Sequence, residues 1–174
     1  MDTPEILEWL LSLAGAAATA LLVRFFVFEL VWVRGRSMMD TLSHGEIVFV
    51  TKYEYAAGGH PRRFDVVICR YPGRGRARFV KRIAALPGET LELRKGILYI
   101  DGRETGEPFI PDLYRTGWKN TFGPFTVPEG HYFVLGDHRN ASNDSRSVGP
   151  LPRKMIRGHV RSVLFPFRRI RRIR

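Results

Sequence analysis

Residues 97–106, with the sequence ILYIDGRETG, indicate the fold class. The apolar run Ile97–Ile100 ends at Asp101-Gly102, a strong signal for a tight hairpin turn because glycine accepts a positive φ at low cost. The preceding run, Thr90–Leu93, is equally short and is separated from it by the turn-like segment RKG. Short apolar segments joined by turn signals predict antiparallel β structure at this point of the chain.

The same pattern recurs on both sides of this hairpin. Short runs rich in Val, Ile, Phe and Tyr, broken by Gly and Pro, lie at Glu46–Val50, Asp65–Cys69, Phe79–Ile83 and Tyr132–Leu135. This spacing predicts a mainly β domain of small twisted sheets over residues 34–167. Residues 101–127, rich in Pro, Gly and polar side chains, are predicted to form a smaller loopy insertion or second subdomain.

A long apolar segment precedes the predicted strands. Trp9–Val23 carries no charge and is short for a bilayer span, which needs about 20 residues. Extension toward residue 28 reaches that length if Arg24 snorkels to the headgroups. We therefore expect residues 1–33 to form one membrane anchor with its juxtamembrane segment. A buried helix of a soluble domain and a cleaved signal peptide are the alternatives, although the first eight residues contain none of the Lys or Arg that a signal requires.

The positive charge of the chain is concentrated at its C-terminal end. The 174 residues contain 28 Lys and Arg against 17 acids, a net charge of +11, and nine of those basic residues but no acid lie in residues 153–174. The remainder is nearly neutral, which argues against a nucleic-acid partner. Residues 168–174 are interpreted as a basic tail, either bound near anionic lipid headgroups or simply solvated.

The residues that could ligate a metal or form a disulfide show no useful spacing. The single cysteine, Cys69, excludes an internal disulfide framework and a multi-Cys zinc site, and its apolar surroundings predict a buried core residue. The five histidines lack metal-ligand spacing. No metal and no cofactor are therefore expected.

Two separate residues have the chemistry of a nucleophile and its base. Ser37 lies in a loop beside the apolar segment, and a serine hydroxyl is a poor nucleophile until a base takes its proton. Strand alternation places Lys81 on one face with Phe79 and Ile83. Burial on that face would lower the lysine pKa and make Lys81 a base, whereas an edge strand would leave an ordinary surface lysine.

A third cluster follows the run Tyr132–Leu135. Asp137, Arg139, Asp144 and Arg146 interleave two acids with two bases in a turn-rich loop. This pattern predicts a buried ion-pair network that fixes the loop, in preference to a metal site or a pair of catalytic acids.

Taken together, the motifs resemble the bacterial type I signal peptidases, in their short single-span form. After the apolar segment, the chain contains SMxxTL at 37–42, GExVFVxK at 45–52, FVKRIxxLPG at 79–88 and VPxGxYFVLGDxRxxSxDSRxxG at 127–149. The SMxxTL motif alone is a weak signal, but the order and spacing of the apolar segment and all four motifs over nearly the whole chain are specific.

The resemblance implies a curved all-β catalytic domain and a Ser/Lys serine endopeptidase without cofactor. Ser37 matches the nucleophile and Lys81 the general base. The supporting and oxyanion positions are matched by Gly35, Ser142, Asp144, Arg146 and Asp137, and the apolar subsites by Val31, Val33, Met38, Leu42, Phe79 and Val80. The implied reaction removes signal peptides from exported preproteins after Ala-X-Ala, on the extracytoplasmic face of the cell membrane. No obligate protein partner is implied.

Two positions depart from the family pattern. Gly35 stands where many members have a serine that donates to the oxyanion. Asp40 replaces the proline of the motif around Ser37. If Asp40 pointed inward, its charge would raise the pKa of Lys81 and impair the enzyme, and if it faced solvent, little would change. An impaired or non-enzymatic membrane-anchored homologue and another Ser/Lys maturation peptidase therefore stay as alternatives.

Overall fold

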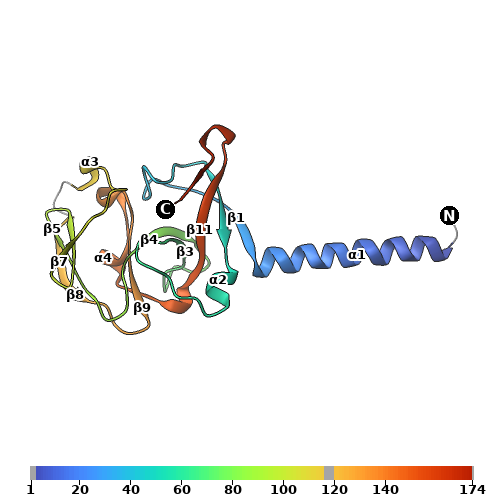
Figure 1. The fold of residues 1–174 in the computed structure, drawn as a ribbon, viewed down its shortest axis with the longest axis horizontal. Coiled ribbons are helices and arrows are strands. Elements are labelled where there is room, and N and C mark those ends of the chain that lie inside the picture. The colour runs from blue at the N-terminus through green and yellow to red at the C-terminus, as the bar shows by residue number, and fades with distance from the viewer. Residues whose placement is uncertain (1–2, 116–119, 174) are drawn as a thin grey trace.

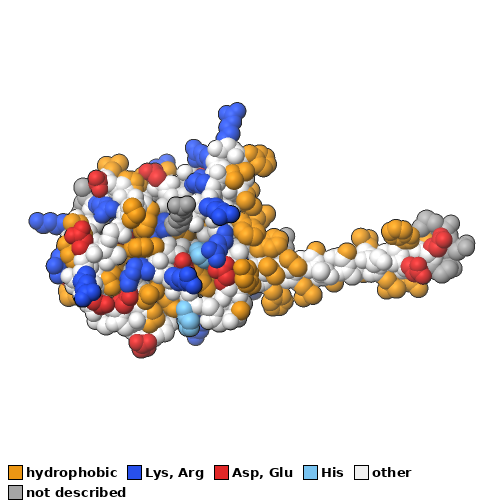
Figure 2. All heavy atoms as spheres, viewed as in Figure 1, with side chains coloured by type: hydrophobic (Ala, Val, Ile, Leu, Met, Phe, Trp, Pro, Cys, Tyr) orange, Lys and Arg blue, Asp and Glu red, His pale blue; other side chains and the backbone are white. Residues whose placement is uncertain are grey.

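One long helix projects away from a β domain (Figure 1). The computed structural model describes residues 3–115 and 120–173. Helix α1 (Thr3–Phe26) contains the apolar window Glu5–Val23, which has a mean hydropathy of 1.9 and is 0% buried within the structure. Figure 2 shows apolar side chains along this helix and acidic ones near its free end. The helix is therefore not a core element of the β domain, and its length and composition suffice for a membrane span.

The larger sheet is antiparallel and curled, which confirms the mainly β fold class. Its strand order is β1-β2-β11-β3-β4-β9-β10, and β12 pairs with β11. The strands are β1 (Phe28–Trp32), β2 (Ile47–Thr51), β3 (Val66–Cys69), β4 (Phe79–Ala85), β9 (His131–Leu135), β10 (Leu151–Pro152), β11 (Ile156–Phe165) and β12 (Arg171–Arg172).

The smaller sheet is built around the predicted hairpin. Its order is β7-β6-β5-β8, with β5 (Thr90–Arg94), β6 (Ile97–Ile100), β7 (Arg103–Thr105) and β8 (Phe122–Thr126). Asp101 and Gly102 have φ angles of 49° and 75°, the positive values that a tight hairpin turn requires. The second subdomain thus contains regular strands and begins at Thr90, earlier than the predicted insertion.

The helices of the β domain are single turns that connect strands. These are α2 (Tyr53–Ala56), α3 (Asp112–Arg115) and α4 (Ser145–Val148), with 3₁₀ turns η2 (Arg139–Ala141), η3 (Arg153–Met155) and η4 (Phe167–Arg169).

Segments just outside both ends of the predicted domain, residues 34–167, also contribute strands to the larger sheet. β1 pairs with β2 although residues 28–32 were grouped with the anchor, and β12 lies inside the expected basic tail. The ten-residue strand β11 has alternating buried and exposed positions, with Arg157 and Arg161 on its exposed side. The basic C-terminal region is therefore partly an interior strand of the sheet, not only a solvated end.

The core forms on both sides of β3 and β4. Val66 and Ile68 pack with Val48 and Val160 in one cluster, whereas Val67 and Cys69 belong to a second cluster on the opposite face. Cys69 is 0% exposed, and burial raises the pKa of its thiol to about 12. This confirms the prediction of a buried core cysteine.

Candidate active site

Ser37 lies in a loop that is fixed by core packing on its C-terminal side. The loop follows β1, and Met38 and Leu42 are buried beneath it with 2% and 0% exposure. The Leu42 N–H donates to the Met38 carbonyl at 2.7 Å, and the His138 N–H donates to the Ser37 carbonyl at 3.1 Å. The apolar residues of the SMxxTL motif therefore hold the half-buried serine in one place.

Lys81 reaches Ser37 from the middle of the larger sheet. Its strand β4 pairs with β3 on one side and β9 on the other, so the edge-strand alternative is wrong. The Lys81 side chain is 2% exposed, and its Nζ lies 2.7 Å from Ser37 Oγ, within hydrogen-bond distance. Burial lowers the pKa of Lys81, and the opposing charges of Asp144 and Asp137 offset only part of that effect.

Asp144 and Arg146 form a buried pair behind the lysine. Asp144 is 0% exposed and accepts from Arg146 Nε at 2.9 Å and from the Gly136 N–H at 3.0 Å. It also caps the N-terminus of α4. Burial alone would raise the pKa of this carboxyl, but the Arg146 guanidinium and the Gly136 N–H lower it below its usual range. Asp144 is therefore a fixed negative charge near Lys81.

Asp137 forms a second buried pair, with Arg82. Arg82 Nε and Nη2 donate to the two Asp137 oxygens at 2.9 and 2.7 Å, and both side chains are almost fully buried. Thr41 donates its hydroxyl to Asp137 and accepts from Arg82 at 3.2 Å. This network joins the Ser37 loop to β4 and to the end of β9.

The predicted loop network is present, but its pairing differs from the sequence expectation. Arg139 pairs with Glu107, a buried acid from the smaller subdomain, and Arg82 pairs with Asp137. Neither Arg82 nor Glu107 was predicted from the sequence to be a supporting residue. Arg82 could have been identified because it directly follows Lys81 in one strand and so lies on the opposite face. No feature of the sequence around Glu107 indicated a supporting role.

Ser142 and Gly136 meet directly beneath Ser37. A Cβ atom at Gly136 would lie 2.2 Å from Ser142 Oγ and 2.5 Å from the Ser37 carbonyl oxygen, so only glycine fits there. Ser142 Oγ is buried there, and its hydroxyl is among the hydrogen-bonding groups that lower the pKa of the Asp144 carboxyl. Gly35 adopts φ +102° and donates its N–H to His44 Nδ1 at 3.2 Å.

A cavity of about 300 Å³ opens beside Ser37 and Lys81, between β1 and β4. Five of the six predicted subsite residues line it, and Leu42 does not, because it is packed in the core under the loop. Four residues in the lining were not predicted. The predicted lining residues are Val31, Val33, Met38, Phe79 and Val80, and the others are Trp32, Arg34, Ile68 and Arg78.

Asp40 faces away from Lys81. Its side chain is exposed, and its Oδ1 accepts a hydrogen bond from the Tyr114 hydroxyl at 3.3 Å. Tyr114 in turn stacks on His138, with ring centroids 4.0 Å apart. The structure therefore has the outward arrangement of Asp40, in which its charge is solvated.

Within residues 3–115 and 120–173, no group of three or more His, Cys, Asp or Glu side chains is placed to hold a metal ion.

Known proteins match this chain in sequence over most of its length. The family model described as signal peptidase, peptidase S26, matches residues 6–165. Signal peptidase I of Bacillus licheniformis is 39% identical over 175 residues, covering 97% of this chain and 93% of that protein. Signal peptidase I T of Bacillus subtilis (strain 168) is 38% identical over 177 residues, covering 97% and 90%.

A solved structure agrees. The crystal structure of a signal peptidase I from Enterococcus faecalis V583 is 38% identical, has a TM-score of 0.50, and covers 57% of this chain and 96% of that chain. A serine in hydrogen-bond contact with a buried lysine, beside an apolar cavity, also suits a serine peptidase. The chain belongs to the signal peptidase family, peptidase S26, whose members are membrane-associated serine peptidases that remove signal peptides.

Proposed function

We propose that this chain cleaves exported preproteins after Ala-X-Ala, with Ser37 as the nucleophile and Lys81 as the general base. The single observation that carries the proposal is the 2.7 Å contact between Lys81 Nζ and Ser37 Oγ, made by a lysine that is 2% exposed. A buried amine that loses its proton easily can accept the serine proton, which is the requirement for a Ser/Lys pair.

The proposed reaction is acyl transfer in two stages. Neutral Lys81 takes the Ser37 proton while Ser37 Oγ attacks the scissile carbonyl, and the Ser37 backbone N–H helps to hold the oxyanion. Lys81 then gives the proton to the leaving amine of the mature chain, and the signal peptide stays esterified to Ser37. A water deprotonated by Lys81 hydrolyses that ester, which frees the signal peptide and restores the serine.

Specificity for small side chains follows from the cavity between β1 and β4. A substrate segment added as a strand between Val31–Val33 and Phe79–Lys81 would direct alternate side chains into this apolar space. A pocket of limited volume discriminates by excluding larger groups, and each extra methylene is worth about 1–3 kcal/mol. Alanine at P1 and P3 is therefore the expected preference.

The proposed topology is a single-pass anchor with the β domain on the extracytoplasmic face of the membrane. α1 ends at Phe26 and β1 begins two residues later, at Phe28, so the cavity lies close to the point where the chain would leave the bilayer. Signal peptides reach the outer face of the membrane at the same level. Anionic lipid headgroups are the expected neighbours of the basic residues.

Cleavage-site mapping tests this function. The full chain in lipid vesicles is given a synthetic preprotein with one Ala-X-Ala site, and the products are identified by mass spectrometry. We expect one cut after the second alanine, lost when that alanine is changed to Phe. Cleavage of other sequences with no preference for alanine would favour another Ser/Lys maturation peptidase, and no cleavage by the folded chain would favour an inert homologue.

The orientation has its own test, made possible by the buried Cys69. An Arg103→Cys variant places a thiol on the exposed strand β7. A membrane-impermeant maleimide added to intact spheroplasts should label this variant and leave the parent chain unlabelled. Labelling only after lysis would place the β domain in the cytoplasm.

A further inference from the structure

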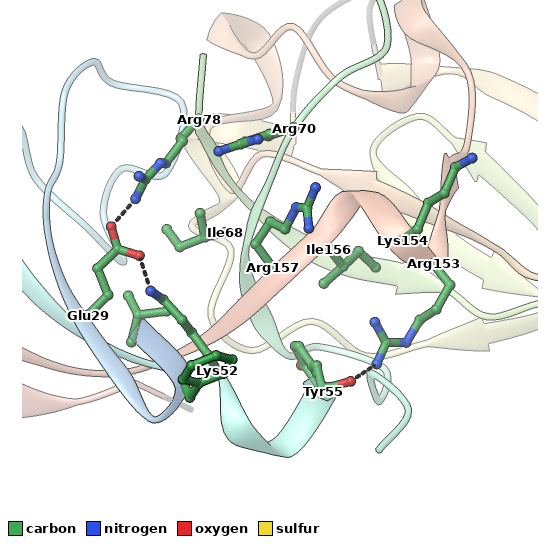
Figure 3. A pocket seen from close by; sticks show the side chains of 12 residues that line it. Glu29, Lys52, Tyr55, Ile68, Arg70, Arg78, Arg153, Lys154, Ile156 and Arg157 are labelled. Atoms are coloured by element: carbon green, nitrogen blue, oxygen red, sulfur yellow. Dashed lines mark hydrogen bonds and ion pairs between the residues drawn. The ribbon is translucent and has the colours of Figure 1, made fainter. Parts of the chain in front are cut away.

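A second, larger cavity lies next to the active-site cavity, at the end of α1 (Figure 3). Its volume is about 510 Å³, and neither Ser37 nor Lys81 lines it. Six basic side chains and one acid, Glu29, line this cavity, which we call the basic cavity. The basic residues are Lys52, Arg70, Arg78, Arg153, Lys154 and Arg157.

The single acid does not neutralise the basic cavity. Glu29 pairs with Lys52 at 2.8 Å and also with Arg78, so one carboxylate serves two cations. Arg153 donates to the Tyr55 carbonyl at 2.9 Å and thus has a neutral partner. A strong positive potential therefore remains within the concave surface.

Arg70 and Arg157 form no ion pair with an acidic side chain among the described residues. No salt bridge joins either of them to an acid within residues 3–115 and 120–173. Arg70 Nε is buried and has no hydrogen-bond partner there either. A buried donor without an acceptor is destabilising, so this guanidinium is suited to an anionic ligand.

Strands of the larger sheet bring the arginines of the basic cavity together along one wall of it. Ile68 of β3 pairs with Gly158 of β11, which places Arg157 beside it, and Ile68 pairs on its other side with Val80, near Arg78. Figure 3 shows Arg70, Arg78 and Arg157 grouped around Ile68. Guanidinium groups that line one cavity suit the oxygens of a phosphate, which a guanidinium can bind in pairs.

The location of the basic cavity indicates which phosphate it would meet. Phe26, the last residue of α1, lines it, and the apolar window of that helix ends at Val23. If α1 spans the bilayer, as the proposed function requires, the cavity lies at headgroup level. Phe26 and Val27 are 65% and 38% exposed and could lie beside acyl chains.

We propose that the basic cavity binds the headgroup of an anionic phospholipid, with Arg70 and Arg157 holding its phosphodiester. Bound there, the lipid headgroup would fill the space between the end of α1 and the cavity wall formed by β3 and β11. It would thus fix the β domain relative to the membrane surface. This inference rests on the membrane anchor of the proposed function but not on the cleavage chemistry.

Lipid retention measured by native mass spectrometry tests the proposal. The full chain in detergent is incubated with dimyristoyl phosphatidylglycerol or dimyristoyl phosphatidylcholine. We expect one phosphatidylglycerol per chain, little phosphatidylcholine, and at least a tenfold lower retained fraction for the double variant Arg70→Gln/Arg157→Gln. The matched control, Lys95→Gln/Arg103→Gln, removes the same charge from exposed positions in the smaller sheet and should retain lipid as the parent does.

Three outcomes would overturn the proposal. The first is equal lipid retention by the double variant and its control. The second is equal retention of phosphatidylglycerol and phosphatidylcholine. The third is displacement of phosphatidylglycerol by equimolar inorganic phosphate, which would indicate a site for free anions. Arg157→Gln alone, at an exposed position, gives the same comparison if the double variant fails to fold. Because retention is measured without substrate, a chain that binds lipid but cleaves nothing would contradict the proposed function alone.

Discussion

Burial of the Lys81 amine should affect stability as well as reactivity. Burial holds the folded-state pKa of Lys81 below its ordinary value of 10.5, so the unfolded chain binds this proton more tightly. The resulting loss of stability is absent above pH 10.5, grows as the pH falls toward the folded-state pKa, and is complete below it. Lys81→Met should therefore raise the free energy of unfolding at pH 7 by about 1 kcal/mol or more.

Urea unfolding at pH 7 and at pH 10.5 measures this difference. The gain for Lys81→Met over the parent should shrink at the higher pH, because the folded parent is then uncharged at this position and the unfolded chain is only about half protonated there. A gain that is the same at both pH values would show that packing, and not the lysine charge, is responsible. Lys154→Met, at an exposed position, is the control for a change in net charge.

The substitution of Asp40 for proline should leave catalysis intact. Asp40 is exposed and bonded to Tyr114, and the carboxylates that raise the Lys81 pKa are Asp144 and Asp137. The rate of cleavage should rise with pH to a plateau as Lys81 loses its proton, and the midpoint should be the same in Asp40→Pro and in the parent. A midpoint that moves to lower pH in Asp40→Pro would show that Asp40 acts on Lys81 after all.

Among single residues, the sequence singled out Ser37 and Lys81, which lie in contact, but not all of the side chains around them. Ser37 and Lys81 lie in motifs whose spacing is fixed along the chain, and strand alternation placed the lysine on an apolar face. Arg82 and Glu107 were missed because their partners, Asp137 and Arg139, lie 55 and 32 residues away. Such pairs depend on tertiary packing, which local patterns do not record.

At the scale of elements, the turn after β9 must pass very close to the Ser37 loop. A methyl group at Gly136 would clash with Ser142 and with the Ser37 carbonyl. Gly136→Ala should therefore displace the serine and lower kcat/KM by about 100-fold or more, as misplacement of a catalytic group by about 1 Å does. Gly106→Ala is the control, because a Cβ atom there meets nothing within 4 Å. Equal activity of the two variants would mean that the Ser37 loop adjusts freely.

The C-terminal strand β12 also holds the Ser37 loop. Arg171 pairs through Nη1 and Nη2 with the buried Glu46, at 2.8 and 2.9 Å, and donates to the Thr41 carbonyl at 2.7 Å. Arg171→Gln should lower the free energy of unfolding by about 1–2 kcal/mol, less than for a fully buried pair because Arg171 is partly exposed. Denaturant unfolding of Arg172→Gln, an exposed neighbour, should show little change. Equal stability of the two variants would contradict this role.

Strands with clear apolar runs were predicted well, and strands with mixed composition were not. β2, β3, β4, β5, β6 and β9 start or end within two residues of the predicted runs. β11 was missed because its basic residues, Arg157 and Arg161, resemble a charged tail, although Val160 and Val163 are fully buried. Its place in the interior of the sheet depends on pairing with β2 and β3, which lie far away in sequence.

At the scale of the whole molecule, the helix and the β domain are separate in structure. The apolar window of α1 is 0% buried, whereas β1 belongs to the larger sheet. Removal of residues 1–26 should leave a folded β domain that no longer sediments with membranes. Removal of residues 1–33 should strongly destabilise it, because β2 then loses β1, one of its two partner strands, and keeps only β11. Circular dichroism and thermal melting check both, and equal stability of the two truncated chains would contradict the assignment of β1 to the domain.

Whether Ser37 and Lys81 act together is measured by the rate at which the parent chain, Ser37→Ala and Lys81→Ala cleave one synthetic Ala-X-Ala preprotein. If Ser37 and Lys81 form a nucleophile and its base, both variants should lose activity by roughly 10⁴-fold or more while their thermal melting shows folded protein. Activity of Lys81→Ala close to that of the parent would contradict the account, because another group would then take the serine proton.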